Sequence, residues 1–212
     1  GIRLTAAVPA SRRALPWLTA SRALAAAGVF GSHLVERLPW SPFTSAVPAV
    51  PDLASEAVGY FFVLSGFVLS LGARSRPTNP EWWRRRAARL VPVYAVTGLA
   101  SVALLVLRGT PPGAADLVTY ATFTQAWWAA TTFAVNPPAW SVSCEVFFYA
   151  TFPVVVVVVL RWLDTPRRRA LAVVALLLAH LVATQTASGQ WPPARLPDFV
   201  LGVVVGAAIA QR

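Results

Sequence analysis

The stretch WSVSCEVFFYATFPVVVVVVL (residues 140–160) decides the fold class. A helix needs about 20 mostly apolar residues to cross the hydrocarbon core of a bilayer, and this stretch supplies them. The helix-breaking sequence Asn-Pro-Pro precedes it at 136–138, and the basic segment RWLDTPRRR follows it at 161–169. The sequence therefore predicts a membrane-spanning helix that begins after a turn and ends at a charged loop.

Apolar stretches of similar character lie on both sides of this helix. They cover residues 15–35, 53–73, 90–107, 170–187 and 199–210. Residues 117–135 are also apolar, but they are rich in threonine and aromatic side chains. We expect them to form an interfacial or re-entrant segment, because one more crossing would contradict the distribution of basic loops. The prediction is an all-α, polytopic transmembrane helix bundle with about six spans.

The composition supports the same class. Hydrophobic residues make up 57% of the 212 residues, charged residues only 12%, and the mean hydropathy is +0.60. Soluble globular domains are nearer 45–50% apolar and 25% charged. These values argue against a disordered chain, a basic nucleic-acid module and an ordinary soluble enzyme, and they indicate a membrane protein. Cys144 is the single cysteine, which excludes an internal disulfide, and no metal-ligand spacing is present.

The net charge of +10 comes from short arginine clusters between the apolar stretches. Basic clusters of this kind mark cytoplasmic loops, so residues 74–89 and 161–169 are predicted to lie inside and 108–138 outside. The many Ala, Val, Arg and Pro residues suggest a bacterial protein of the cytoplasmic membrane. The chain starts at Gly1 and contains no methionine, which predicts that residues 1–212 are one partial integral-membrane domain.

Polar residues inside apolar spans are candidates for function, because each is costly to insert. Arg22 and His33 are eleven positions apart, roughly 16 Å along a helix and near the same face. Arg22 could hold an anion, and His33 could act as a general base. Alternatively, Arg22 extends to the headgroups and His33 lies at the interface beside Glu36 and Arg37.

Ser141, Glu145 and Tyr149 recur at every fourth position and form one polar stripe on the predicted helix. Glu145 could be a base, an orienting partner of His33, or a structural partner of Arg22. The alternative to a functional role is that Glu145 forms a structural ion pair. Cys144 faces another direction, where packing is favoured over a reactive thiol.

Two further patterns have a structural and a functional interpretation. Ser65, Gly66 and Ser70 form a small, polar face that most often marks close helix packing, with a substrate path as the alternative. The cluster WWRRRAAR (82–89) is first a topology signal, yet arginine also binds phosphate well. Arg85 and Arg89 are four apart, so both could contact a phosphorylated donor.

Taken together, these segments resemble acyltransferase family 3, a family of integral-membrane acyltransferases. Three blocks match in the family's order. The first is SRALAAAGVFGSH (21–33), the second is GYFFVLSGFVLS (59–70) with WWRRRAARLVPVY (82–94), and the third is NPPAWSVSCEVFFYATFP (136–153). LPDFVLGVVVG (196–206) is similar to a later span of the family. Family members have about ten spans, more than the six expected here.

The resemblance assigns roles residue by residue. Arg22 and His33 match the family's essential pair, and Arg86 and Arg89 match its Arg-x-x-Arg element. Val142 replaces the leucine that is usual in the third block. The predicted catalytic residues are His33, Glu145 and Arg22. The predicted substrate-binding residues are Arg85, Arg86, Arg89, Tyr94, Trp140, Ser141, Tyr149 and Ser65.

The implied activity is transfer of an acyl group, often acetyl from acyl-CoA, to a hydroxyl of a sugar, a cell-envelope glycan or a secondary metabolite such as a macrolide. Acyl-CoA would be a co-substrate, with no bound cofactor and no metal. The expected surroundings are the lipid bilayer, the donor and the acceptor, without nucleic acid. A transporter of lipid-linked sugars or acyl groups is the alternative, because intramembrane Arg, His and Glu also suit transport. A non-catalytic fragment that assembles with a partner is a third hypothesis.

Overall fold

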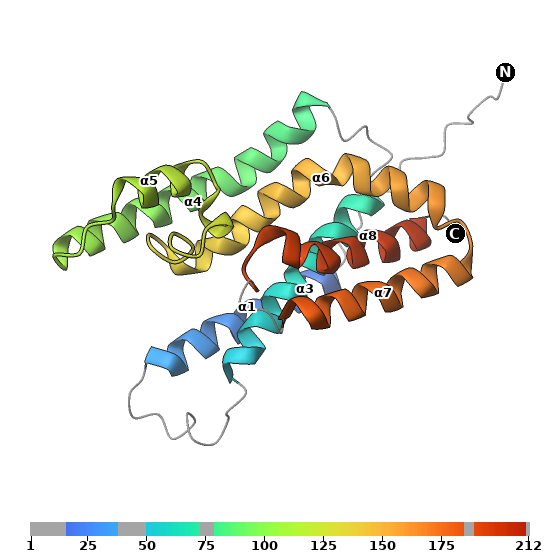
Figure 1. Cartoon of the computed structure of the whole chain (residues 1–212), viewed down its shortest axis with the longest axis horizontal. Helices are drawn as coiled ribbons and strands as arrows, with labels where there is room; N and C mark the ends of the chain where they lie inside the picture. The colour runs from blue at the N-terminus through green and yellow to red at the C-terminus, as the bar shows by residue number, and fades with distance from the viewer. Residues whose placement is uncertain (1–15, 38–49, 73–78, 185–188, 211–212) are drawn as a thin grey trace. The chain divides into compact units, whose positions relative to one another are not determined.

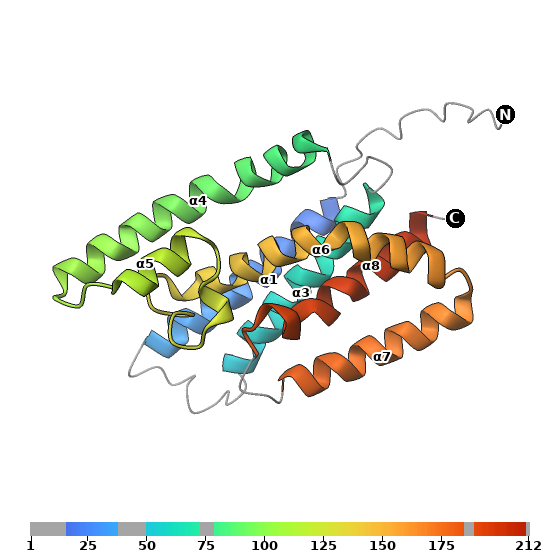
Figure 2. The ribbon, with the colours of Figure 1, turned by 45° about the horizontal axis from the view of Figure 1, so that its top comes forward.

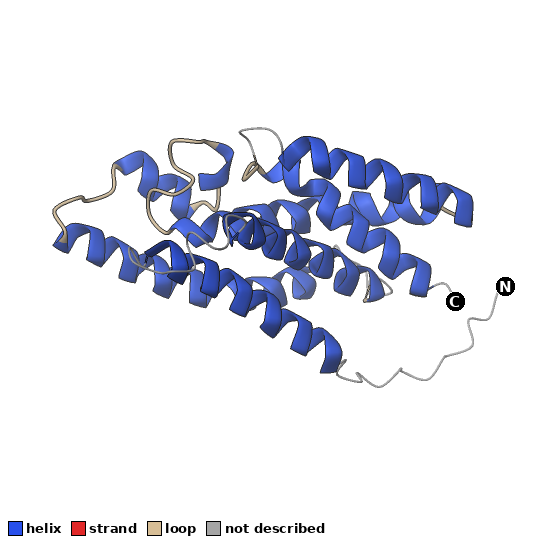
Figure 3. Ribbon diagram, turned by 90° about the horizontal axis from the view of Figure 1, so that it is seen from below, coloured by secondary structure: helices blue, strands red, loops and turns tan. Residues whose placement is uncertain are grey.

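The computed structural model describes residues 16–37, 50–72, 79–184 and 189–210. Every regular element in these ranges is a helix, and no strand occurs among them (Figure 3). The chain divides into two compact units, residues 1–57 and 58–212, each of which is described by itself. The helices are α1 Pro16–Arg37, α3 Val50–Leu71, α4 Pro80–Leu107, α5 Ala114–Ala121, α6 Trp140–Trp162, α7 Pro166–Thr184 and α8 Leu196–Ala210, and the short 3-10 turns are η1 Gln125–Trp127, η2 Pro137–Ala139 and η3 Pro192–Arg195.

Three stretches of the described chain are long and apolar enough to cross a membrane: Pro80–Leu107, Pro137–Trp162 and Pro192–Ala210. The apolar part of α3, Glu56–Leu71, is shorter. The predicted count of about six is therefore not reached. Helix α7 begins with three consecutive arginines, and α1 contains Arg22, so both are less apolar than the sequence pattern suggested.

The segment 117–135 does not form a spanning helix. It contains the end of α5, which has eight residues in all, and the three-residue turn η1. Phe123 follows α5 with a positive φ of 59°, a conformation that is costly for an aromatic residue and reverses the chain. The expectation that this segment adds no further crossing agrees with these bounds.

Helix α6 lies at the centre of the larger unit. Phe148 and Phe152 on this helix are completely buried. The ring of Phe148 stacks on Phe199 of α8 at 4.8 Å and meets Phe62 of α3 edge-on at 5.0 Å. Trp82 of α4 stacks on Phe152 at 6.0 Å. Helices α6 and α8 run in one direction and α4 and α7 in the other, and α7 lies alongside α8 (Figures 1 and 2).

Glycines allow α3 and α8 to touch through their backbones. A Cβ atom at Gly66 would lie 2.0 Å from the carbonyl oxygen of Phe199, and one at Gly202 would lie 1.9 Å from that of Val63. A Cβ at Gly206 would lie 2.0 Å from the Ser70 hydroxyl oxygen. Small residues permit such approach wherever helices pack without a hydrophobic driving force. The packing interpretation of Gly66 and Ser70 is therefore confirmed.

Tyr94 and Tyr120 join α4 to α5. Their rings stack at 4.2 Å with 12° between the planes. The Tyr94 hydroxyl donates to the Tyr120 carbonyl at 2.7 Å, and the Tyr120 hydroxyl donates to the Tyr94 carbonyl at 3.0 Å. Both hydroxyl groups are thus used within the fold. This geometry gives Tyr94 a packing role, and its predicted contact with substrate stays a prediction.

We expect Tyr94→Phe and Tyr120→Phe each to lower the free energy of unfolding by about 1 kcal/mol, the usual net value of one hydrogen bond. Thermal unfolding in detergent measures this effect. Acyl transfer should fall only in proportion to the folded fraction for both variants. A large loss of activity in Tyr94→Phe alone, at unchanged stability, would instead favour a contact between Tyr94 and substrate.

Candidate functional site

Glu145 and Tyr149 form the centre of a polar site on α6. The Tyr149 hydroxyl donates a hydrogen bond to Oε1 of Glu145, one helical turn earlier. Ser65 of α3 donates to the same oxygen at 3.5 Å, although 80 residues separate it from Glu145 in the chain. Tyr149 is buried and Glu145 is half-buried. Two hydroxyl groups, one from α3 and one from α6, thus donate to the same oxygen of the Glu145 side chain.

Arg86 lies on the other side of Tyr149. Its guanidinium carbon is 3.7 Å from the ring centroid of Trp82 and 5.7 Å from that of Tyr149. Its Nη1 donates to the Trp82 carbonyl at 3.0 Å. Its Nε is buried and has no hydrogen-bond partner among the described residues. A buried donor without a partner is costly, so this nitrogen is available to a ligand that could accept from it.

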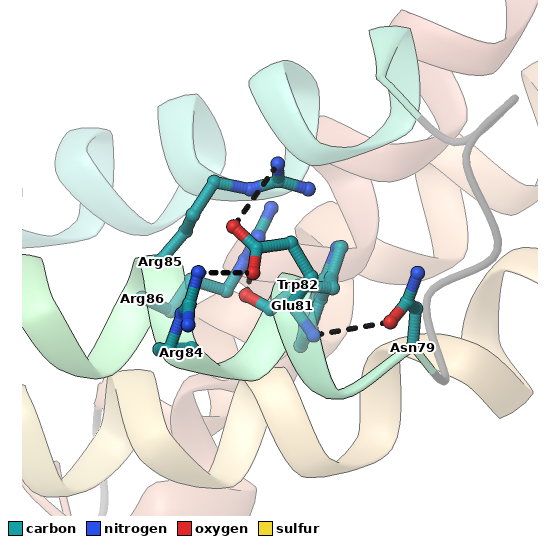
Figure 4. A network of polar contacts seen from close by, with 6 residues as sticks. All are labelled: Asn79, Glu81, Trp82, Arg84, Arg85 and Arg86. Atoms are coloured by element: carbon teal, nitrogen blue, oxygen red, sulfur yellow. Dashed lines mark hydrogen bonds and ion pairs between the residues drawn. The ribbon is translucent and has the colours of Figure 1, made fainter.

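The other arginines of the cluster are more exposed than Arg86. Figure 4 shows the Glu81 carboxylate between Arg84 and Arg85, at 2.6 and 3.6 Å. Both arginine side chains are more than half exposed, so these ion pairs contribute little to stability. Arg89 is exposed on the same helix. Of the three arginines predicted to bind phosphate, only Arg86 is thus held against Tyr149.

Trp140 and Ser141 lie nearer the start of α6 than this site does. The Ser141 hydroxyl donates to the Pro138 carbonyl at 3.0 Å, which is a local bond at the beginning of the helix. Trp140 packs edge-on against Phe62 at 6.1 Å. The predicted polar stripe therefore holds for Glu145 and Tyr149 but does not include the Ser141 hydroxyl. Cys144 is completely buried, as the packing interpretation required.

Arg22 and His33, the pair predicted to be catalytic, lie on α1, in the unit of residues 1–57. Arg22 is half-buried there. The side chain of His33 falls outside the part of the structure that is described. The predicted partnership of His33 with Glu145, and that of Arg22 with the donor, stay predictions.

A second charged group, missed in the sequence, lies where α7, α8 and the turn η3 meet. Nδ1 of His180 is 2.5 Å from Oδ1 of Asp198, and Nη1 of Arg195 is 3.7 Å from Oδ2. Arg195 is 2% and Asp198 5% exposed, and the Arg195 guanidinium lies 5.7 Å from the Trp140 ring. Part of the signal was present, because His180 is a polar residue inside the apolar stretch 170–187, as Glu145 is inside its own stretch. Asp198 lies just before the stretch 199–210 and gave no such signal.

We expect Asp198→Asn to lower the free energy of unfolding by about 2 kcal/mol, since hydrogen bonds to charged groups contribute about 1.5–3 kcal/mol. Asparagine has a similar shape but loses the charge between Arg195 and His180. Chemical unfolding followed by the fluorescence of the buried tryptophans measures the change. As a matched control, Asp164→Asn removes a carboxylate whose ion pair with Arg168 is more than half exposed, and it should have a small effect. Equal effects of the two substitutions would contradict a structural role for the buried group.

Comparison with known proteins gives the family. The family model described as an acyltransferase domain matches residues 15–211. The chain is also 33% identical over 218 residues to Acyltransferase MdmB from Streptomyces mycarofaciens, with 90% of this chain covered. It spans about half of that relative's length, since the match covers 56% of the relative. No solved structure matches the chain. The helical fold, the site on α6 and the match over almost the whole chain lead to one conclusion: this chain belongs to acyltransferase family 3.

Proposed function

We propose that the protein is a membrane-bound O-acyltransferase that moves an acyl group, acetyl in the simplest case, from acyl-CoA to a hydroxyl of a sugar, a cell-envelope glycan or a secondary metabolite. The observation that carries the proposal is the group formed by Glu145, Tyr149 and Arg86. It combines a carboxylate held by hydroxyl donors with a half-buried cation whose buried Nε has no partner among the described residues. Family membership supplies the reaction class.

In this proposal the acceptor oxygen attacks the thioester carbonyl carbon, the carbon–sulfur bond breaks, and the acceptor proton finally resides on the coenzyme A thiol. His33 takes the acceptor proton as general base, and Glu145 orients it or stabilises its charged form. Arg22 helps to hold the donor near its thioester. Arg86, with Arg85 and Arg89 on the same helix, attracts the donor's phosphates, because arginine makes paired hydrogen bonds to phosphate oxygens.

The charge distribution supports a cytoplasmic donor. Helices α4 and α7 run in the same direction, and each begins with an arginine cluster, at 84–89 and 167–169. Under the positive-inside rule both beginnings lie in the cytoplasm, where acyl-CoA is available. We propose a multi-pass protein in a bacterial cytoplasmic membrane. No bound cofactor and no metal take part in this reaction scheme.

Release of coenzyme A thiol tests the reaction class. Membranes that contain the protein are supplied with acetyl-CoA and a crude extract of host glycans and metabolites, and matched membranes without the protein serve as the control. Acceptor-dependent thiol release, together with an acetylated product in the mass spectrum, is the expected result. Movement of an acyl or sugar compound across the membrane without thiol release would overturn the proposal and favour the transporter hypothesis.

A further inference from the structure

A cavity of about 530 Å³ lies beside the beginning of α6, in the larger unit. One wall is formed by residues of the loop before α6, namely Ala126, Trp127, Ala129, Thr132 and Phe133, and the other is formed by Gln190 and Trp191, which precede η3. Cavities of this size accommodate small organic molecules. Neither the residues of the α6 site nor the arginines of α4 line it.

The walls are aromatic and uncharged. Trp127, Phe133 and Trp191 provide the aromatic faces, Thr132 and Gln190 provide the polar groups, and the remaining lining residues are alanines. Trp127 and Trp191 meet edge-on, with ring centroids 6.2 Å apart and planes at 84°, so the rings form a corner. Phe133 is 50% and Trp191 42% exposed, which leaves both rings accessible to a ligand.

The chemistry of this lining indicates which of the two substrates, the acyl-CoA donor or the hydroxylated acceptor, fits the cavity better. An acyl-CoA donor carries phosphates, and a phosphate site needs either cationic side chains or several N–H groups that point at the phosphate. None of the described residues that line the cavity carries a charge. An acceptor with hydroxyl groups on an apolar ring fits better, because aromatic faces cover the ring while amide and hydroxyl groups bind at its edge.

The cavity is held open by hydrogen bonds behind its walls. Nε of Arg195 donates to the Gly189 carbonyl at 2.5 Å, and Sγ of Cys144 lies 3.5 Å from the Gln190 carbonyl. On the other wall, the Thr132 hydroxyl donates to the Trp128 carbonyl at 2.9 Å, and the buried Gln125 amide donates to the Ala139 carbonyl at 2.9 Å. Walls fixed in this way lose little entropy when a ligand binds.

The cavity and the arginine clusters also lie toward opposite ends of the helices. The residues that line the cavity come just before α6 and α8 in the chain, so the cavity lies near the beginnings of these two helices. The arginines lie at the beginnings of α4 and α7, which run in the opposite direction. We propose that this cavity is the acceptor subsite, and that it takes an uncharged, ring-shaped molecule with hydroxyl groups, such as a glycoside. The inference rests on the proposed function, because that function supplies the need for an acceptor.

Saturation-transfer NMR tests the proposal without requiring acyl transfer. The full chain in lipid nanodiscs is mixed with phenyl β-D-glucopyranoside, an uncharged hydroxylated ring with an aromatic substituent. We expect saturation of the ligand protons with the native protein, and at least a fivefold weaker effect with Trp191→Ala and with Phe133→Ala. Trp128→Ala is the matched control, because Trp128 is a 63% exposed indole on the same loop that does not line the cavity. Its signal should equal that of the native protein.

Equal saturation in all four proteins, or none in the native protein, would overturn the proposal. Thermal unfolding of each variant separates a lost subsite from a lost fold, and Phe133→Ala is the milder change because half of its ring is exposed. Excess coenzyme A should leave the signal unchanged, and its disappearance would reassign the cavity to the donor. If the glycoside binds through Trp191 but no thiol is released in the acyl-transfer assay, the proposed function fails while the binding site stands.

Discussion

Replacement of Gly202 by leucine is expected to leave no folded protein. The Cβ atom alone would lie 1.9 Å from the Val63 carbonyl oxygen and 2.8 Å from the Phe67 amide nitrogen, so α3 and α8 would have to separate. Backbone atoms cannot move aside as a flexible side chain can. Even Gly202→Ala should lower the free energy of unfolding by about 3 kcal/mol, the upper part of the range for overpacked cores.

Size-exclusion chromatography in detergent and thermal unfolding measure the effect, with Gly66→Ala as an independent test of the same contact from α3. Gly31→Ala provides the matched control, because a Cβ at Gly31 would meet no atom of the described residues within 4 Å. Alanine there should be neutral, or stabilising by up to about 1 kcal/mol, since it favours the helix. Recovery of native-like, stable Gly202→Leu would show that the two helices do not pack through their backbones.

The elements that could be predicted from the sequence are those set by local pattern. The predicted span 140–160 corresponds to α6, Trp140–Trp162, because an uninterrupted apolar run between Asn-Pro-Pro and a basic loop has few other solutions. Apolar character alone overestimated the number of spans, since α7 includes the three arginines that were assigned to a loop. The bond between Glu145 and Tyr149 was also predictable, because residues four apart meet on a helix.

Contacts between distant segments were not predictable from these patterns. Ser65 reaches Glu145 across 80 residues, and His180 reaches Asp198 from another helix. The spacing of the arginines suggested that Arg85 and Arg89 act together. Tertiary packing instead buries Trp82 against Phe152, and Arg86 then lies over the Trp82 ring and faces Tyr149. Burial of Trp82 therefore determines how Arg86 is placed against the site.

Among single substitutions at the site on α6, Glu145→Gln is expected to have the largest effect on activity. The substitution keeps the size of the side chain and removes its charge, so the hydroxyl groups of Tyr149 and Ser65 keep an acceptor while the site loses its anion. We expect kcat to fall by about 100-fold or more, the range for groups that assist proton transfer, equivalent to about 2.7 kcal/mol of barrier. Steady-state thiol release with acetyl-CoA measures kcat and KM separately.

Two controls separate the charge of Glu145 from its position. Tyr149→Phe removes a hydrogen bond to the carboxylate but leaves the charge, so kcat should fall by about tenfold or less. Glu145→Asp keeps the charge and should recover part of the activity that Glu145→Gln loses. If Glu145→Gln retained more than a third of the native kcat at unchanged stability, a catalytic role for the carboxylate would be wrong, and the site on α6 would be a structural one.

A double substitution then tests whether Glu145 acts through His33. Groups that work as a unit give strongly non-additive losses, because the second substitution removes a function that the first has already disabled. If Glu145 orients or charges His33, then His33→Ala and His33→Ala with Glu145→Gln should have the same residual activity. If the loss of activity in the double variant instead equals the product of the two single losses, the two side chains act independently. Glu145 would then act together with Arg86, because Tyr149 contacts both of these residues.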